Sequence, residues 1–185
     1  MNHNITEHRS RDGRTPTSIR LLQNPIDFIA EDHLRLRAMC AELDRLADAE
    51  RPETEALEEM QEYLAHELPA LLNDEDLDVL PMLLDRAEPE DELPSLARRL
   101  GREHREIEGC LGFVLDLLAA SAPAAMASSS FRQALRDLAR VTRRHLILEN
   151  AVLLPLARVR LTDADLVALR QAMLRRRGLQ DLFVA

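Results

Sequence analysis

Residues 71–81 read Leu-Leu-Asn-Asp-Glu-Asp-Leu-Asp-Val-Leu-Pro, and residues 145–155 read His-Leu-Ile-Leu-Glu-Asn-Ala-Val-Leu-Leu-Pro. In both stretches a glutamate, Glu75 or Glu149, is followed six residues later by a proline. Each stretch lies within a long pattern of apolar residues spaced three and four apart, which indicates an amphipathic helix. The chain therefore contains an internal repeat that two of its helices carry.

The repeat extends to two further helical patterns. One contains Asp32-His33 and the other Glu103-His104, and each histidine has an apolar residue three positions later. The two halves of the chain thus match as helical hairpins. We interpret the sequence as a duplicated hairpin in which each half supplies a histidine and then a glutamate.

The second glutamate has a histidine one helical turn before it. His145 and Glu149 are four residues apart, so they share one helix face and can bind the same metal ion or adjacent ions. The first half departs from the repeat here, because the position that matches His145 is Leu71.

The helical patterns predict an all-α fold, an antiparallel four-helix bundle with a short fifth C-terminal helix packed outside. Asn24-Pro25 begins the first helix, and Thr162 with Asp165 caps the fifth, which Gly178 ends. Pro69 and Pro81 are expected to kink the second helix. The inward stripes are expected to include Met82 in the second helix, and Val152 and Leu156 in the fourth. The predicted helices span about 24–49, 53–87, 91–120, 131–158 and 162–178.

Three segments follow from this pattern. We predict a disordered N-terminal tail over 1–23, the bundle over 24–160, and a C-terminal helix and tail over 161–185. A linker of small residues, 121–130, separates the third and fourth helices.

Composition supports the helical interpretation and excludes other classes. The 185 residues are 46% hydrophobic but only 3% aromatic, with five glycines, which disfavours a β-sandwich or barrel. The net charge of −9, with Arg175–Arg177 as the one basic block, argues against nucleic acid and anionic membrane surfaces as partners. The apolar run 111–127 is too short to span a bilayer. Two cysteines make no secreted disulfide framework, so we expect a cytoplasmic protein.

Five ionisable residues lie on the inward stripes of the four helices. A single histidine on an apolar face is usually a core residue, but convergence of histidines and carboxylates from facing helices is how bundles hold metal ions. Burying such groups without partners is costly. The candidate metal ligands are His33, Glu75, His104, His145 and Glu149.

Other polar and sulfur-containing residues have simpler interpretations. We expect His66 at the surface, and Glu108 on a solvated flank with a substitute-ligand role as the alternative. Asp76 and Asp78 are expected to form a solvated face. Core packing is favoured for Cys40 and Cys110, and a redox role stays open if their thiols meet.

At these residues the chain resembles the hemerythrin-like (HHE cation-binding) family over roughly residues 25–160. The family pattern is a histidine on the first helix, His-x-x-x-Glu on the second, a histidine on the third and His-x-x-x-Glu on the fourth. The resemblance implies a non-haem di-iron centre in which both glutamates bridge the ions and the histidines are terminal ligands. The departure at Leu71 leaves one ion with a vacant position or a lower affinity. The matching positions are His33, Leu71 with Glu75, His104, and His145 with Glu149.

The resemblance implies a protein that binds or senses a small diatomic molecule or peroxide. Imidazole with carboxylate suits iron, whereas structural zinc favours cysteine. No cysteine precedes residue 24, which argues against the repair of iron–sulfur clusters. Two alternatives stay open, a metal-depleted bundle that acts as an interaction or regulatory module, and an oxidase or peroxidase. The sequence does not indicate a protein partner.

Overall fold

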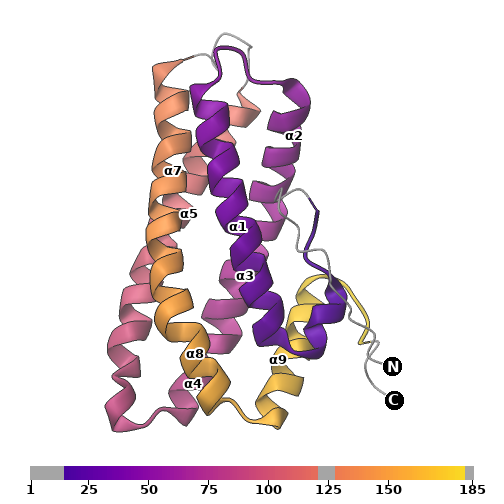
Figure 1. The fold of residues 1–185 in the computed structure, drawn as a ribbon, viewed down its shortest axis with the longest axis vertical. Coiled ribbons are helices and arrows are strands. Elements are labelled where there is room, and N and C mark those ends of the chain that lie inside the picture. Colours follow the sequence, from indigo (N-terminus) through magenta and orange to yellow (C-terminus); the bar gives the residue numbers. More distant parts are fainter. Residues whose placement is uncertain (1–14, 121–127, 182–185) are drawn as a thin grey trace, which may run out of the picture.

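The computed structural model describes residues 15–120 and 128–181, and every regular element in these ranges is helical. Four long arms run up, down, up and down beside one another, with α9 against their lower end (Figure 1). The first arm is α1 (Pro25–Asp48), preceded by a 3-10 turn, η1 (Ile19–Gln23), and the third is α5 (Leu93–Ala119), preceded by η4 (Pro89–Asp91). The all-α antiparallel bundle with a short fifth helix is confirmed.

The second and fourth arms are each built of consecutive helical segments. The second comprises α2 (Thr54–Glu62), η2 (Tyr63–Glu67), α3 (Leu68–Asp74), η3 (Glu75–Val79) and α4 (Leu80–Arg86). The fourth comprises α7 (Ser129–Leu148), η5 (Glu149–Leu153) and α8 (Leu154–Arg160), and α9 (Asp163–Arg176) follows it.

Side-chain caps fix where these helices begin. The Asn24 side chain accepts a hydrogen bond from the backbone of Ile26, and Pro25 fits the first helical position, where no N–H is required. Thr162 and Asp165 form a reciprocal capping box at the start of α9. Gly178 adopts a left-handed φ of 67° just beyond the end of α9, as predicted for its stop.

Three wide π-helical turns, η2, η3 and η5, each lie just before a proline. In each, the residue after the turn donates its backbone N–H to the carbonyl five residues earlier, and a proline comes next. A proline in a helix lacks an N–H and collides with the carbonyl four residues before it, and a wider turn relieves that conflict. The prolines expected to kink the second arm therefore follow π turns within a continuous arm. They are Pro69 and Pro81. In the fourth arm, Pro155 follows a π turn in the same way.

The extra residue in a π turn changes which later side chains face the core. Val152 is 40% exposed, and Leu153 is buried in its place. The inward position predicted for Val152 is therefore wrong by one residue, because the prediction assumed a regular α-helix where η5 is wider. Met82 packs against the core but is only partly buried, and the fully buried position belongs to Leu83.

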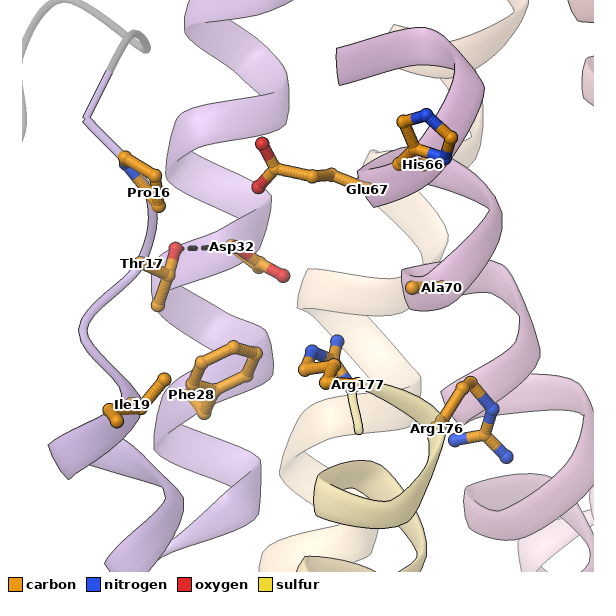
Figure 2. Close-up of a pocket in the computed structure, with 10 residues that line it drawn as sticks. All are labelled: Pro16, Thr17, Ile19, Phe28, Asp32, His66, Glu67, Ala70, Arg176 and Arg177. Carbon is orange, nitrogen blue, oxygen red and sulfur yellow. Dashed lines mark hydrogen bonds between the residues drawn. The ribbon is translucent and has the colours of Figure 1, made fainter. Parts of the chain in front are cut away.

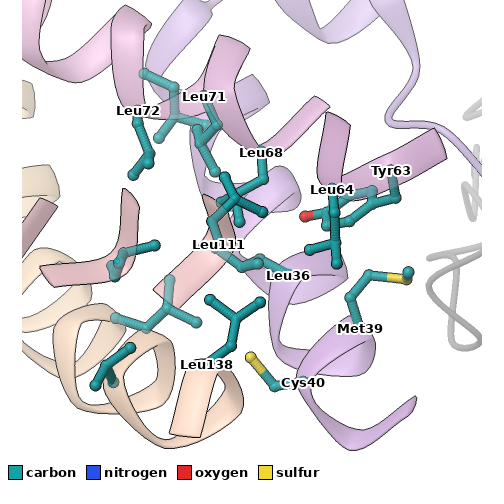
Figure 3. Packing of buried hydrophobic residues seen from close by; sticks show 14 of the residues in the cluster. Leu36, Met39, Cys40, Tyr63, Leu64, Leu68, Leu71, Leu72, Leu111 and Leu138 are labelled. Carbon is teal, nitrogen blue, oxygen red and sulfur yellow. The ribbon is translucent and has the colours of Figure 1, made fainter. Parts of the chain in front are cut away.

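The buried side chains of all four arms form one apolar core. Leu36 of α1, Leu68 of α3, Leu111 of α5 and Leu138 of α7 belong to it, and Figure 3 shows them packed together. The core is rich in leucine because helices favour it and aromatics are few.

The predicted N-terminal tail needs a correction. Residues 19–23 form η1 and Leu22 is fully buried, so the tail predicted over 1–23 is too long at this end. Residues 1–14 of that tail lie outside the described residues, as do residues 121–127 of the predicted linker. Ser128 closes the linker by capping α7.

Among the described residues, no helix is both long enough and apolar enough to cross a bilayer.

Candidate metal centre

Four of the five predicted ligands bring donor atoms to one point in the core. One donor atom from each of Glu75, His104, His145 and Glu149 lies within 4.8 Å of all the others. The two imidazoles meet edge to face, with Nε2 of His104 3.0 Å from Nε2 of His145. Oε1 of Glu149 lies 2.9 Å from Nε2 of His145 and 3.4 Å from Nε2 of His104.

The fifth predicted ligand, His33, lies on the opposite side of the two carboxylates. Its Nε2 is 2.9 Å from Oε1 of Glu75 and 3.4 Å from Oε2 of Glu149. It is outside the compact group of four, although both glutamates connect it to that group. The structure thus brings all five residues together, with four in the compact group and His33 beside the two carboxylates.

The glutamates occupy equivalent places in the repeat. Glu75 is the first residue of η3 and Glu149 the first residue of η5, so each carboxylate leaves its arm where the helix widens. Wider turns of this kind are frequent at functional sites. The Glu-x-x-x-x-x-Pro repeat was the sequence signal for them.

Two carboxylates outside the group of four lie beside the Nδ1 atoms of His104 and His145. Oδ1 of Asp76 is 2.7 Å from Nδ1 of His104, and Oε2 of Glu103 is 3.2 Å from Nδ1 of His145. Arg99 donates to Glu103 in turn. A carboxylate at Nδ1 favours a proton there, which leaves Nε2 as the lone-pair donor toward the core.

Helical periodicity did not predict these outer partners. Asp76 was expected on a solvated face, but it is only 34% exposed and contacts His104. Asp78 is half-buried and accepts a hydrogen bond from Arg176, so it too is not a solvated group. Glu103 was noted only as part of the repeat, because side-chain contacts between arms are not visible in helical periodicity.

Burial and mutual charge shift the proton affinities of the site. Although burial alone would lower them, neighbouring carboxylates raise the pKa of His33 to about 9 and that of His104 to about 10. Burial and the charge of Glu149 raise the pKa of Glu75 to about 7. Despite its burial, Glu149 has a pKa below its ordinary range because His104 and His145 hydrogen-bond to it. The metal-free group therefore retains protons to balance its buried carboxylates.

The remaining candidates lie elsewhere. His66 is 68% exposed and Glu108 is exposed, as expected. Cys40 is buried in the core, where burial raises the pKa of its thiol to about 12, and Cys110 is partly buried. Both thiols are free. Leu71 is 2% exposed and supplies no donor.

The donor set fits a cation. Two imidazole Nε2 atoms at 3.0 Å repel each other unless a proton or a cation lies between them. Oε2 of Glu75 is buried without a hydrogen-bond partner among the described residues. Such buried groups are expensive unless they are satisfied. Two imidazoles and two carboxylates supply nitrogen and oxygen ligands of the kind that divalent and trivalent iron bind.

Comparison with known proteins agrees with this arrangement. No protein of established function and no solved structure matches the chain significantly. The model of one family, described as the hemerythrin HHE cation binding domain, matches residues 24–157. This range covers the first three arms, the fourth arm as far as Ala157, and every residue of the candidate centre. The chain therefore belongs to the hemerythrin HHE cation-binding family.

Proposed function

We propose that this protein binds iron in its core and through it binds or senses a small ligand such as O2, NO or peroxide. The observation that carries the proposal is the compact group of Glu75, His104, His145 and Glu149, whose donor atoms lie within 4.8 Å of one another. These four residues would hold an ion together. The cytoplasmic location expected from composition belongs to the same proposal.

The protein's own residues define what such a centre can do. Glu103 hydrogen-bonds with Nδ1 of His145, and the Asp76 carboxylate lies 2.7 Å from Nδ1 of His104, so both carboxylates favour Nε2 as the ligand atom of these imidazoles. When bound, iron supplies redox chemistry and an open position for a small ligand. Leu71, which stands where the repeat would place a histidine, supplies no ligand atom, so one coordination position would stay open. The surrounding leucines exclude bulk water and limit the site to small molecules.

The number of ions is part of the proposal. The family resemblance predicts two irons, with His33 serving the second one. On that side the donors are His33 and the shared carboxylates of Glu75 and Glu149, because Leu71 contributes none. We therefore expect the His104–His145 side to retain an ion after desalting and the His33 side to bind one too weakly to retain it.

Iron retention tests this function. After anaerobic reconstitution with Fe(II) and desalting, we expect iron to stay with the unmodified protein and with the surface variant His66→Leu. The variant His145→Leu should retain less iron by a factor of roughly ten or more, because the change removes a ligand and leaves Glu149 without the His145 imidazole as a partner. Absorbance changes on adding O2, NO or peroxide would then identify the small ligand.

The alternative function is a metal-free interaction or regulatory bundle. The buried Leu71 favours it, since a bundle without metal has no need of a complete ligand set. In that case the unmodified protein would retain no iron, and His145→Leu would stabilise the apo fold by relieving a buried polar group. Loss of stability in the apo variant would contradict the alternative. Sustained peroxide consumption that depends on His145 would instead indicate an enzyme.

A further inference from the structure

The internal repeat includes the outer partner of a metal-ligand histidine. In the second half, Glu103 precedes His104 in sequence, and its carboxylate lies at Nδ1 of His145. In the first half, Asp32 precedes His33 in the same way. Since Glu103 contacts His145, the corresponding partner of Asp32 would be the residue that matches His145, and that residue is Leu71.

Asp32 lies in the wall of a pocket of about 430 Å³ between α1 and the second arm. Figure 2 shows its side chain on α1, facing the arm that carries Ala70, the residue next to Leu71. It accepts a hydrogen bond from Thr17. Among the described residues, no histidine contacts this carboxylate.

Leu71 lies in the apolar core beside Leu68 and Leu72 (Figure 3). Its position, four residues before Glu75, repeats the spacing of His145 and Glu149. A side chain at this position therefore shares a helix face with Glu75. A leucine here fills space but offers neither a ligand atom nor a donor for Asp32.

The charge that accompanies the outer carboxylate is also repeated. Arg99, four residues before Glu103, donates to it. The residue four before Asp32 is Phe28, which carries no charge, but the Arg177 guanidinium lies over the Phe28 ring, 5.1 Å from its centroid. Arg177 also interacts electrostatically with Asp32. Arg177, which directly follows the last residue of α9, thus places a cation near Asp32, as does Arg35 of α1.

We propose that Asp32 is the outer carboxylate of a second metal position whose inner ligand is lost at Leu71, so that the protein binds one ion and Leu71→His restores the second. The inference rests on the proposed function. It follows from the donor count, because the His104–His145 side has four clustered donors and the opposite side has His33 with shared carboxylates only. A histidine at position 71 would add one donor beside His33 and place its other nitrogen toward Asp32.

The test counts Fe(II) retained per chain after anaerobic reconstitution. The variants are Leu71→His, the double variant Leu71→His with Asp32→Asn, and Leu72→His as a matched control. Leu72 is buried on the same helix but has no counterpart among the ligands. We expect one ion in the unmodified protein and in Leu72→His, and two in Leu71→His. The second ion should bind roughly tenfold more weakly in the double variant, because its ligand loses its outer carboxylate.

A second variant covers the case in which a buried histidine prevents folding. Leu71→Cys is a smaller and less polar change, and a thiolate that binds Co(II) gives a charge-transfer absorbance that the unmodified protein lacks. We expect that band together with a second Co(II) per chain. Folding of every variant is checked by circular dichroism and urea unfolding.

The outcomes separate the two proposals. Two ions in the unmodified protein would overturn the inference, as would one ion in folded Leu71→His, or equal affinity with and without Asp32. No ion in the unmodified protein would instead contradict the proposed function itself. One ion rising to two, with dependence on Asp32, would support both.

Discussion

Glu103 shows at the scale of a single residue how a group outside the ligand set can govern metal binding. Its carboxylate hydrogen-bonds with Nδ1 of His145 and accepts a hydrogen bond from Arg99. Glu103→Gln should weaken iron binding by roughly 10–100-fold, since outer partners of histidine ligands typically contribute this much. Competition with a chelator measures the change, and Glu106→Gln, exposed on the same helix, is the control. Equal affinities in the two variants would refute the role.

The raised pKa values of the buried histidines predict how the stability of the metal-free protein depends on pH. The pKa of His33 is about 9 and that of His104 about 10 in the folded protein, against an ordinary 6.5. A group whose pKa is raised by folding stabilises the folded state fully at pH values below its unfolded-state pKa. This contribution is lost as the pH rises through its folded-state pKa. The free energy of unfolding of the apo protein should therefore fall between about pH 7 and about pH 8.5.

Urea unfolding at the two pH values measures this slope. His104→Gln should make it shallower, whereas His66→Gln should leave it unchanged because His66 is exposed. Stability that does not change with pH over this interval would mean that the buried histidines are neutral in the apo protein.

At the scale of the helical element, the π turns decide how prolines are tolerated. The backbone before Pro155 is already widened by η5, so replacing this proline by alanine should change the free energy of unfolding by about 1 kcal/mol or less. Arg140→Pro, at an exposed site within the regular α7, should cost about 3 kcal/mol or more. Urea unfolding compares the two. A large loss in Pro155→Ala would indicate that the proline itself maintains the π turn.

For the whole molecule, one fully buried carboxylate helps to hold α9 and the residue that follows it against the bundle. Asp74, the residue before Glu75, accepts hydrogen bonds from Arg176 and Arg177. Arg177→Ala should cost roughly 2–4 kcal/mol because it leaves a buried charge with fewer partners. Arg175→Ala, which alters an exposed residue of the same basic block, should have little effect. Thermal unfolding of both variants measures the difference, and equal losses would contradict this role for Asp74.

The docking of α9 also connects the outside of the molecule to the candidate centre. Asp74 and Glu75 are adjacent, so the ion pairs of α9 hold the start of η3, from which the Glu75 carboxylate reaches the core. In sequence, Arg175–Arg177 appeared only as a basic block with too little charge for nucleic acid. Its structural use required a buried acidic partner that lies about a hundred residues away in the chain.

The helices, their antiparallel order and the five inward histidines and glutamates could be predicted from the sequence, because helical periodicity and capping are local properties. The contacts between the arms could not be predicted in this way. Folding of the chain brings Asp76 and Glu103 to Nδ1 of two histidines, and the widened η5 buries Leu153 in place of Val152. Those features depend on contacts between distant segments and on helix widening before proline, neither of which a regular period of 3.6 residues describes.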